Sequence, residues 1–147
     1  MSPGRSIAAL ALAAMVGGML FFGAVMAPLV FTKLPPDVAG AFIRAAFPRY
    51  YGFVTACAAV AAAALLLRGA WAGALASAVL AAVTLWLWTG LMPHLEKLRL
   101  AGDKTAFARG HRLSVWVNGF ELLAAAALLL RVVANGAGNR GVHRRDR

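Results

Sequence analysis

Cysteine and acidic residues are scarce in this sequence. Only one of its 147 residues is cysteine, so the chain has no disulfide framework, and five are Asp or Glu against 15 Lys or Arg. Zinc-binding, phosphate-loop and nucleophile-elbow motifs are also missing. We therefore expect a protein that is not an enzyme and needs no cofactor. Cys57 falls inside an apolar run, where we expect it to act as a small buried hydrophobic residue.

Long polar stretches of the kind that fold into a soluble domain are missing too. Hydrophobic residues make up 62% of the chain and its mean hydropathy is +0.76, whereas soluble domains are roughly 45–50% apolar. We expect an all-α integral membrane protein, with an antiparallel four-helix bundle over residues 1–134 and a disordered basic tail over 135–147. The runs long enough to span a bilayer are 7–31, 50–67, 71–92 and 113–133.

The net charge of +10 does not take the form of a nucleic-acid-binding surface. Lys and Arg side chains gather at the ends of the apolar runs and near the end of the chain, where they anchor helices and meet anionic headgroups. The partner we expect is therefore the lipid bilayer and not nucleic acid. Seven of the 15 Lys and Arg residues fall on the side of the chain termini and eight on the other, so the positive-inside rule selects no orientation.

The two halves of the chain resemble each other at an offset of 65 residues. This offset lays the first predicted helix on the third and the second on the fourth, which favours two hairpin repeats related by an axis along the membrane normal. The matched residues are Pro28 with Pro93, Ala41 with Ala106, Phe42 with Phe107, and Arg44 with Arg109.

Four polar residues recur inside the otherwise apolar fourth run. His111, Ser114, Asn118 and Glu121 are spaced three, four and three residues apart, which puts them on one face of an α-helix. The opposite face carries Leu, Val, Trp and Phe side chains. A membrane helix with such a stripe must hide it from lipid, so we expect the other three helices to cover it.

The depth of each residue along its span predicts which side chains face Asn118 and Glu121, the inner half of the stripe. Counted from the side of the two long loops, Thr55 is level with Asn118, and Thr84 is level with Glu121. The sequence therefore predicts a buried polar cluster on the fourth helix. The candidate ligand-binding residues are His111, Ser114, Asn118, Glu121, Thr84 and Thr55.

The segment before the second span is amphipathic. Residues 37–47 either lie on the membrane surface or extend the second helix outward, and a proline follows where we expect a kink. An arginine and two tyrosines come next, a combination typical of the membrane interface. We expect an interfacial mouth formed by Pro48, Arg49, Tyr50 and Tyr51, together with His111 and Ser114.

Glu121 is the costliest residue to bury. An ionised carboxylate at mid-bilayer costs roughly 2.5–3.5 kcal/mol, so Glu121 must be protonated, hydrogen-bonded or placed at a wet cavity. One interpretation is that the cluster binds or passes a small polar or cationic ligand. The alternative is a structural or assembly subunit, in which the same side chains hold helices together or meet a second copy or another membrane protein.

A metal or redox role is a third alternative. His94 and His111 flank the second long loop and Met92 lies nearby, but these residues are too few to define a metal site, and we assign no metal ligand. A catalytic dyad is excluded, because His111 and Glu121 are ten residues apart, which corresponds to about 15 Å along a helix.

Three short motifs carry a resemblance to a known family. Residues 27–31 (Ala-Pro-Leu-Val-Phe) close the first span, 47–51 (Phe-Pro-Arg-Tyr-Tyr) open the second, and His111, Ser114 and Asn118 open the fourth. In this order the chain resembles the transmembrane-protein-205-like domain family, also known as DUF4149, over roughly residues 8–133. The resemblance implies a four-helix integral membrane protein and no established activity. The Ala-, Gly- and Arg-rich composition is typical of a high-GC bacterium, so we expect a cytoplasmic membrane location.

Overall fold

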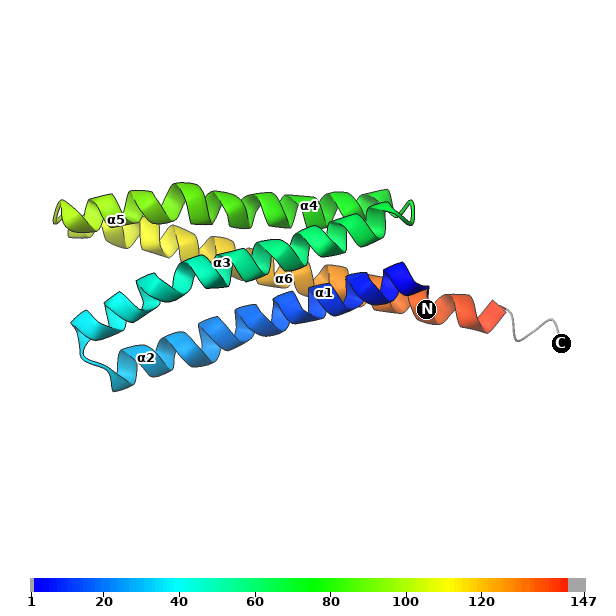
Figure 1. Ribbon diagram of the computed structural model, residues 1–147, viewed down its shortest axis with the longest axis horizontal. Coiled ribbons are helices and arrows are strands. Elements are labelled where there is room, and N and C mark those ends of the chain that lie inside the picture. The colour runs from blue at the N-terminus through cyan, green and yellow to red at the C-terminus, as the bar shows by residue number, and fades with distance from the viewer. Residues whose placement is uncertain (1, 143–147) are drawn as a thin grey trace.

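The computed structural model describes the backbone of residues 2–142 and the side chains of residues 2–135. Within that range the chain forms four antiparallel helical rods and no strand, which confirms the predicted all-α bundle (Figure 1). The first hairpin joins the first two rods and the second hairpin joins the last two. The elements are α1 (Pro3–Leu20), η1 (Phe21–Met26) and α2 (Ala27–Lys33) in the first rod, α3 (Pro36–Leu66) in the second, α4 (Trp71–Trp86), η2 (Leu87–Leu91) and α5 (Met92–Leu100) in the third, and α6 (Lys104–Val142) in the fourth.

All four rods are long and apolar enough to cross a membrane. Large apolar side chains cover their outer surfaces, among them Leu10, Trp71 and Trp116, each at least two-thirds exposed. A soluble protein rarely exposes so much apolar surface, whereas lipid solvates it. The chain is therefore an integral membrane protein.

The rods extend beyond the predicted spans at the long-loop end. Residues 37–47 belong to α3, which runs without interruption through Pro48, so the outward extension of the helix is correct and the surface-lying alternative is not. The fourth helix begins at Lys104 because the Asp103 carboxylate caps it by accepting a 2.9 Å hydrogen bond from the Ala106 amide. At the other end α6 continues to Val142, so helix occupies the first part of the stretch expected to be disordered, and residues 143–147 lie outside the described residues.

The internal repeat has a structural counterpart in two short π-helices. In η1 the Ala27 amide donates to the Phe22 carbonyl, and in η2 the Met92 amide donates to the Leu87 carbonyl. Each wide turn comes directly before a proline, Pro28 or Pro93, whose ring would clash with a regular helix and which lacks an amide proton. Both features recur at the offset of 65 residues, which supports the interpretation as two hairpin repeats.

The bundle core is continuous at the terminal end and divided at the long-loop end. The two hairpins lie close together near the chain termini and separate toward the other end (Figure 1). At that other end Val30, Ala39 and Ile43 pack inside the first hairpin, whereas Leu91 and Leu95 of the second belong to a separate cluster, which reaches the first hairpin through α3. The middle of the bundle is filled by one cluster, consisting of Met15, Met19, Val54, Ala58, Leu80 and Ala125.

Close packing of α5 on α6 depends on a glycine, and this generates a testable prediction. A Cβ atom at Gly110 would overlap Cδ2 of Leu95, a side chain that is only 4% exposed and held in the core. We expect Gly110→Ala to lower stability by about 1–3 kcal/mol through overpacking. Thermal unfolding of the purified protein in detergent, followed by circular dichroism, measures this change.

Gly119→Ala is the matched control on the same helix, since a Cβ atom there meets nothing within 4 Å. We expect its unfolding midpoint to equal or slightly exceed that of the native protein. Equal midpoints for the two variants would contradict the packing of Leu95 against Gly110.

Candidate functional site

Two deeply buried polar side chains face each other across α4 and α6. Thr84 and Glu121 are 1% and 3% exposed, and the Thr84 hydroxyl donates to Glu121 Oε1 over 2.7 Å. The same hydroxyl lies 2.9 Å from the carbonyl oxygen of Leu80 in its own helix. The structure thus brings together the two residues that depth along the spans puts at one level.

Glu121 lies close to the middle of the membrane-spanning part of α6. It is two residues from the centre of the apolar run 113–133. Ala125, one turn further on, belongs to the middle core cluster, and Leu80 and Leu87 flank Thr84 on the facing helix. The carboxyl group is therefore enclosed by apolar layers on both sides, in the region where a charge is costliest.

One oxygen of this carboxyl group has no partner. Glu121 Oε2 is buried and makes no hydrogen bond within the described residues, and the same holds for Thr55 Oγ1. Thr55 is predicted to join the cluster, but its hydroxyl is bonded to none of the cluster residues. Buried polar atoms without partners cost about 1–3 kcal/mol each, so these two oxygens are the unsatisfied part of the site.

Asn118 connects α6 to α3. Its side-chain oxygen accepts a 3.2 Å hydrogen bond from the Tyr50 hydroxyl, and its amide nitrogen donates to the Tyr51 hydroxyl over 3.4 Å. The amide also donates to the Ser114 carbonyl oxygen over 2.8 Å within α6. Asn118 is therefore held from both helices, one turn before Glu121.

The tyrosines do not form the predicted interfacial mouth. Tyr51 is 2% exposed, and it continues the buried face of α3 that carries Val54 and Ala58, so its hydroxyl reaches inward. Pro48 and Arg49 are exposed, and the Arg49 guanidinium donates to the Ala45 carbonyl oxygen of its own helix over 2.9 Å. The prediction was wrong for the tyrosines because the rotation of α3 about its axis turns them toward Asn118.

The outer half of the polar stripe separates from the inner half. Ser114 is buried, and its hydroxyl donates to the His111 carbonyl oxygen over 2.7 Å, so within the described side chains it makes no hydrogen bond to another helix. His111 is exposed and stacks parallel to Phe107, with ring centroids 6.1 Å apart. His111 thus belongs to the surface of the long-loop end and not to the buried cluster.

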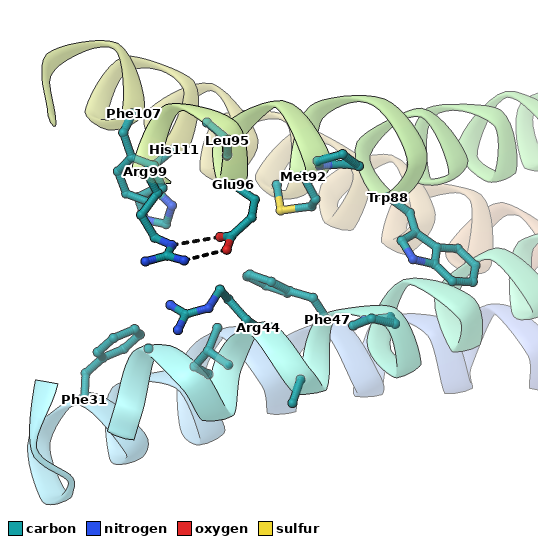
Figure 2. A pocket seen from close by; sticks show the side chains of 15 residues that line it. Phe31, Arg44, Phe47, Trp88, Met92, Leu95, Glu96, Arg99, Phe107 and His111 are labelled. Carbon is teal, nitrogen blue, oxygen red and sulfur yellow. Dashed lines mark hydrogen bonds and ion pairs between the residues drawn. The ribbon is translucent and has the colours of Figure 1, made fainter. Parts of the chain in front are cut away.

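A cavity of about 740 Å³ opens where the two hairpins diverge (Figure 2). His111 lines it, but Ser114, Asn118 and Glu121 do not. Apolar side chains make up most of its wall, and Arg44, Glu96 and Arg99 stand at its outer part. The lining residues are Phe31, Gly40, Ile43, Arg44, Ala45, Phe47, Pro48, Trp88, Met92, Pro93, Leu95, Glu96, Arg99, Phe107 and His111.

The described residues contain no group of three His, Cys, Asp or Glu side chains that could hold a metal ion. His94 is exposed and does not line the cavity that His111 lines. The two histidines on either side of the second long loop therefore do not share this pocket.

Sequence reasoning missed the charged residues of the cavity. Glu96 and Arg99 form a two-bonded ion pair of 2.8 and 2.5 Å within α5, and Arg44 reaches toward them from α3 (Figure 2). Two signals in the sequence point to these residues. The acidic and basic residues are three positions apart just beyond the third span, and Arg44 is at a similar distance before the second.

Residues 10–104 match the model of a family described as a domain of unknown function, DUF4149. The match ends where α6 begins, so the stripe from His111 to Glu121 lies outside it. Among curated proteins and solved structures, none matches the chain. The matched part covers more than half of the 147 residues and includes most of the first membrane-spanning rod and all of the second and third. The chain therefore belongs to the DUF4149 family.

Proposed function

We propose that this protein is a non-enzymatic membrane protein whose buried cluster around Glu121 binds a small polar or cationic ligand, in the simplest case a proton. The observation that carries the proposal is the Glu121 carboxyl group, which is 3% exposed, bonded through Oε1 to Thr84 and unpartnered at Oε2. The proposed location is a bacterial cytoplasmic membrane, in keeping with the Ala-, Gly- and Arg-rich composition.

The energetics favour an occupant at Oε2. An ionised carboxylate in this position costs roughly 2.5–3.5 kcal/mol on insertion scales, and a bound proton or cation removes that cost by neutralising the charge. The hydrogen bond from Thr84 does not neutralise it, since a hydroxyl carries no net charge. The site therefore has one group that gains from binding a positive species.

The surroundings limit the size of the ligand. The cavity at the long-loop end does not reach Glu121, and apolar layers enclose the carboxyl group from both sides. A proton fits without any movement of the helices. A larger cation would need the helices to part. The oxygens of Thr84, Thr55 and Asn118, which the count puts at or within one turn of the depth of Glu121, would then replace part of the cation's hydration shell.

The competing proposal is a structural or assembly role. It is favoured by the hydrogen bonds of the cluster, which tie α6 to α4 through Thr84 and to α3 through the two tyrosines. Interhelical hydrogen bonds of this kind stabilise membrane bundles by about 0.6–2 kcal/mol. The two proposals differ in one respect: binding needs the titratable carboxyl group, whereas the structural role needs only the hydrogen bond.

Glu121→Gln separates the two roles. The amide has the shape of the carboxyl group and still accepts from Thr84, but it does not bind a proton or balance a cation. We expect the native protein in lipid vesicles to show a buried carboxyl band in its infrared spectrum that responds to pH or to Na⁺, K⁺ or NH₄⁺. The variant is expected to lack that response and to keep a thermal midpoint close to the native value.

Glu96→Gln is the matched control, because Glu96 and Glu121 are the two glutamates of the sequence and Glu96 lies at the cavity rim. This variant should retain the buried carboxyl band. A native spectrum in which no buried carboxyl band changes with pH or with any of the three cations would refute the binding proposal.

Thr84→Val tests the structural contribution of the same pair. Valine keeps the shape of threonine but leaves Glu121 Oε1 without its donor, so we expect a loss of about 1–3 kcal/mol in unfolding free energy. Ser77→Ala is the control, because Ser77 is fully buried on the same helix and donates only to the Gly73 carbonyl oxygen. Ser77→Ala should lower the unfolding free energy clearly less than Thr84→Val. Equal losses for the two variants would mean that the Thr84–Glu121 hydrogen bond does not stabilise the contact between α4 and α6.

A further inference from the structure

The polarity of the cavity changes along its length. At its inner end Trp88, Met92 and Phe47 present aromatic, thioether and hydrocarbon surface (Figure 2). At its outer end, toward the long loops, Arg44 and the Glu96–Arg99 ion pair, which are the charged residues of the lining, stand among the rings of Phe31, Phe107 and His111. A ligand that matches both ends has an apolar chain and a charged or polar head.

Depth in the membrane follows the same gradient. Trp88 and Met92 fall within the apolar span 71–92, whereas Glu96 lies four residues beyond it, or about 6 Å further out at 1.5 Å per residue. Arg44 lies six residues before the span that begins at Tyr50, or about 9 Å out. The headgroup layer is about 5–8 Å thick on each side of the hydrocarbon, and long arginine side chains reach it from these positions.

The sign of the charge indicates an anionic head. Arg99 is paired with Glu96, but Arg44 makes no hydrogen bond or ion pair in the part of the chain that the structure describes. Among the residues from 33 to 37, 44 to 49 and 96 to 112, which form this end of the bundle, eight are Lys or Arg and three are Asp or Glu. Guanidinium groups bind phosphate with two parallel hydrogen bonds, so Arg44, which faces Glu96 without forming an ion pair in the described residues, offers a group that can bind phosphate.

The cavity also has the size and position for a ligand that comes from the bilayer. Its volume of about 740 Å³ lies within the range of roughly 300–1,000 Å³ that small-molecule sites occupy. It lies between two hairpins whose outer surfaces carry exposed apolar side chains, such as Leu29 at 54% exposure, in the part of the chain that is apolar enough to span the bilayer. A chain from a neighbouring lipid therefore enters sideways without crossing water.

We propose that this cavity binds one anionic phospholipid, with an acyl chain against Trp88, Met92 and Phe47 and its phosphate at Arg44. This site is separate from the Glu121 cluster and does not depend on the ligand proposed there. The Glu96–Arg99 pair borders the phosphate. One guanidinium N–H of Arg99 can turn toward the phosphate while another N–H of the same group stays bonded to Glu96. The acyl chain replaces apolar packing that the divided core does not provide at this end.

The test is native mass spectrometry of the full chain, purified in mild detergent with equal amounts of phosphatidylglycerol and phosphatidylcholine. We expect one phosphatidylglycerol to be retained in preference to phosphatidylcholine. Arg44→Gln should reduce that preference about fivefold, the effect of one basic residue at an anionic lipid surface. Ala45→Trp, which fills the cavity from α3, should reduce retention of both lipids.

Two controls on the same helix keep the result specific. Arg49→Gln and Ala41→Trp change exposed residues that do not line the cavity, and both should behave like the native protein. Circular dichroism melts of all four variants exclude unfolding as the cause of lipid loss. Equal retention of the two lipids, or retention unaffected by Ala45→Trp, would overturn the proposal, and so would displacement of the lipid by inorganic phosphate alone.

Discussion

The hydrogen bond between Thr84 and Glu121 marks the constraint on which the rest of this bundle depends. A chain that crosses hydrocarbon must satisfy its polar groups internally, because no solvent is present to do so. The backbone meets this requirement by being helical from Pro3 to Lys33 and in each later rod. The side chains meet it where α6 carries Asn118 and Glu121, and α3 and α4 supply the hydroxyl groups that bind them. The mutual orientation of three helices is thereby fixed within about one turn of α6.

Toward the long loops the two hairpins diverge (Figure 1). The two π-helices occur at equivalent places in the two hairpins, each just before a proline, and the rods beyond them are α2 and α5. The core divides in the same region, with Val30 and Ile43 in one hairpin and Leu91 and Leu95 in the other. Wide turns of this type change the direction of the following helix and are common at functional sites. The cavity is therefore the product of an irregularity that the sequence carries twice.

Much of this arrangement could be predicted from the sequence, and the failures share one cause. Counting residues from the ends of the spans measures position along the membrane normal, and it correctly puts Thr84 beside Glu121. Rotation of a helix about its own axis and the divergence of hairpins depend on packing between rods, which counting does not address. For this reason the sequence predicts an interfacial position for the tyrosines, which in fact bind Asn118, and it does not predict the cavity beside Arg44. The same limit applies to Thr55, which the count puts level with Asn118 but whose hydroxyl makes no hydrogen bond within the described residues.

An aromatic layer lies between the cavity and the Glu121 cluster and contacts both. Phe47 lines the cavity and stacks on Tyr51 with centroids 5.6 Å apart, and Tyr51 in turn packs edge-on against Tyr50 at 5.0 Å. Both tyrosine hydroxyls bind Asn118, one turn from Glu121. The rings thus seal the cavity from the carboxyl group with apolar surface, while their hydroxyls extend the polar cluster toward it. A ligand that displaces Phe47 would disturb Tyr51, which stacks on it directly, and Tyr50, which contacts it through Phe22, and would thereby disturb both hydrogen bonds of these tyrosines to Asn118. The two sites are therefore separated by side chains that belong to one or the other of them: Phe47 lines the cavity, and Tyr50 and Tyr51 bind Asn118.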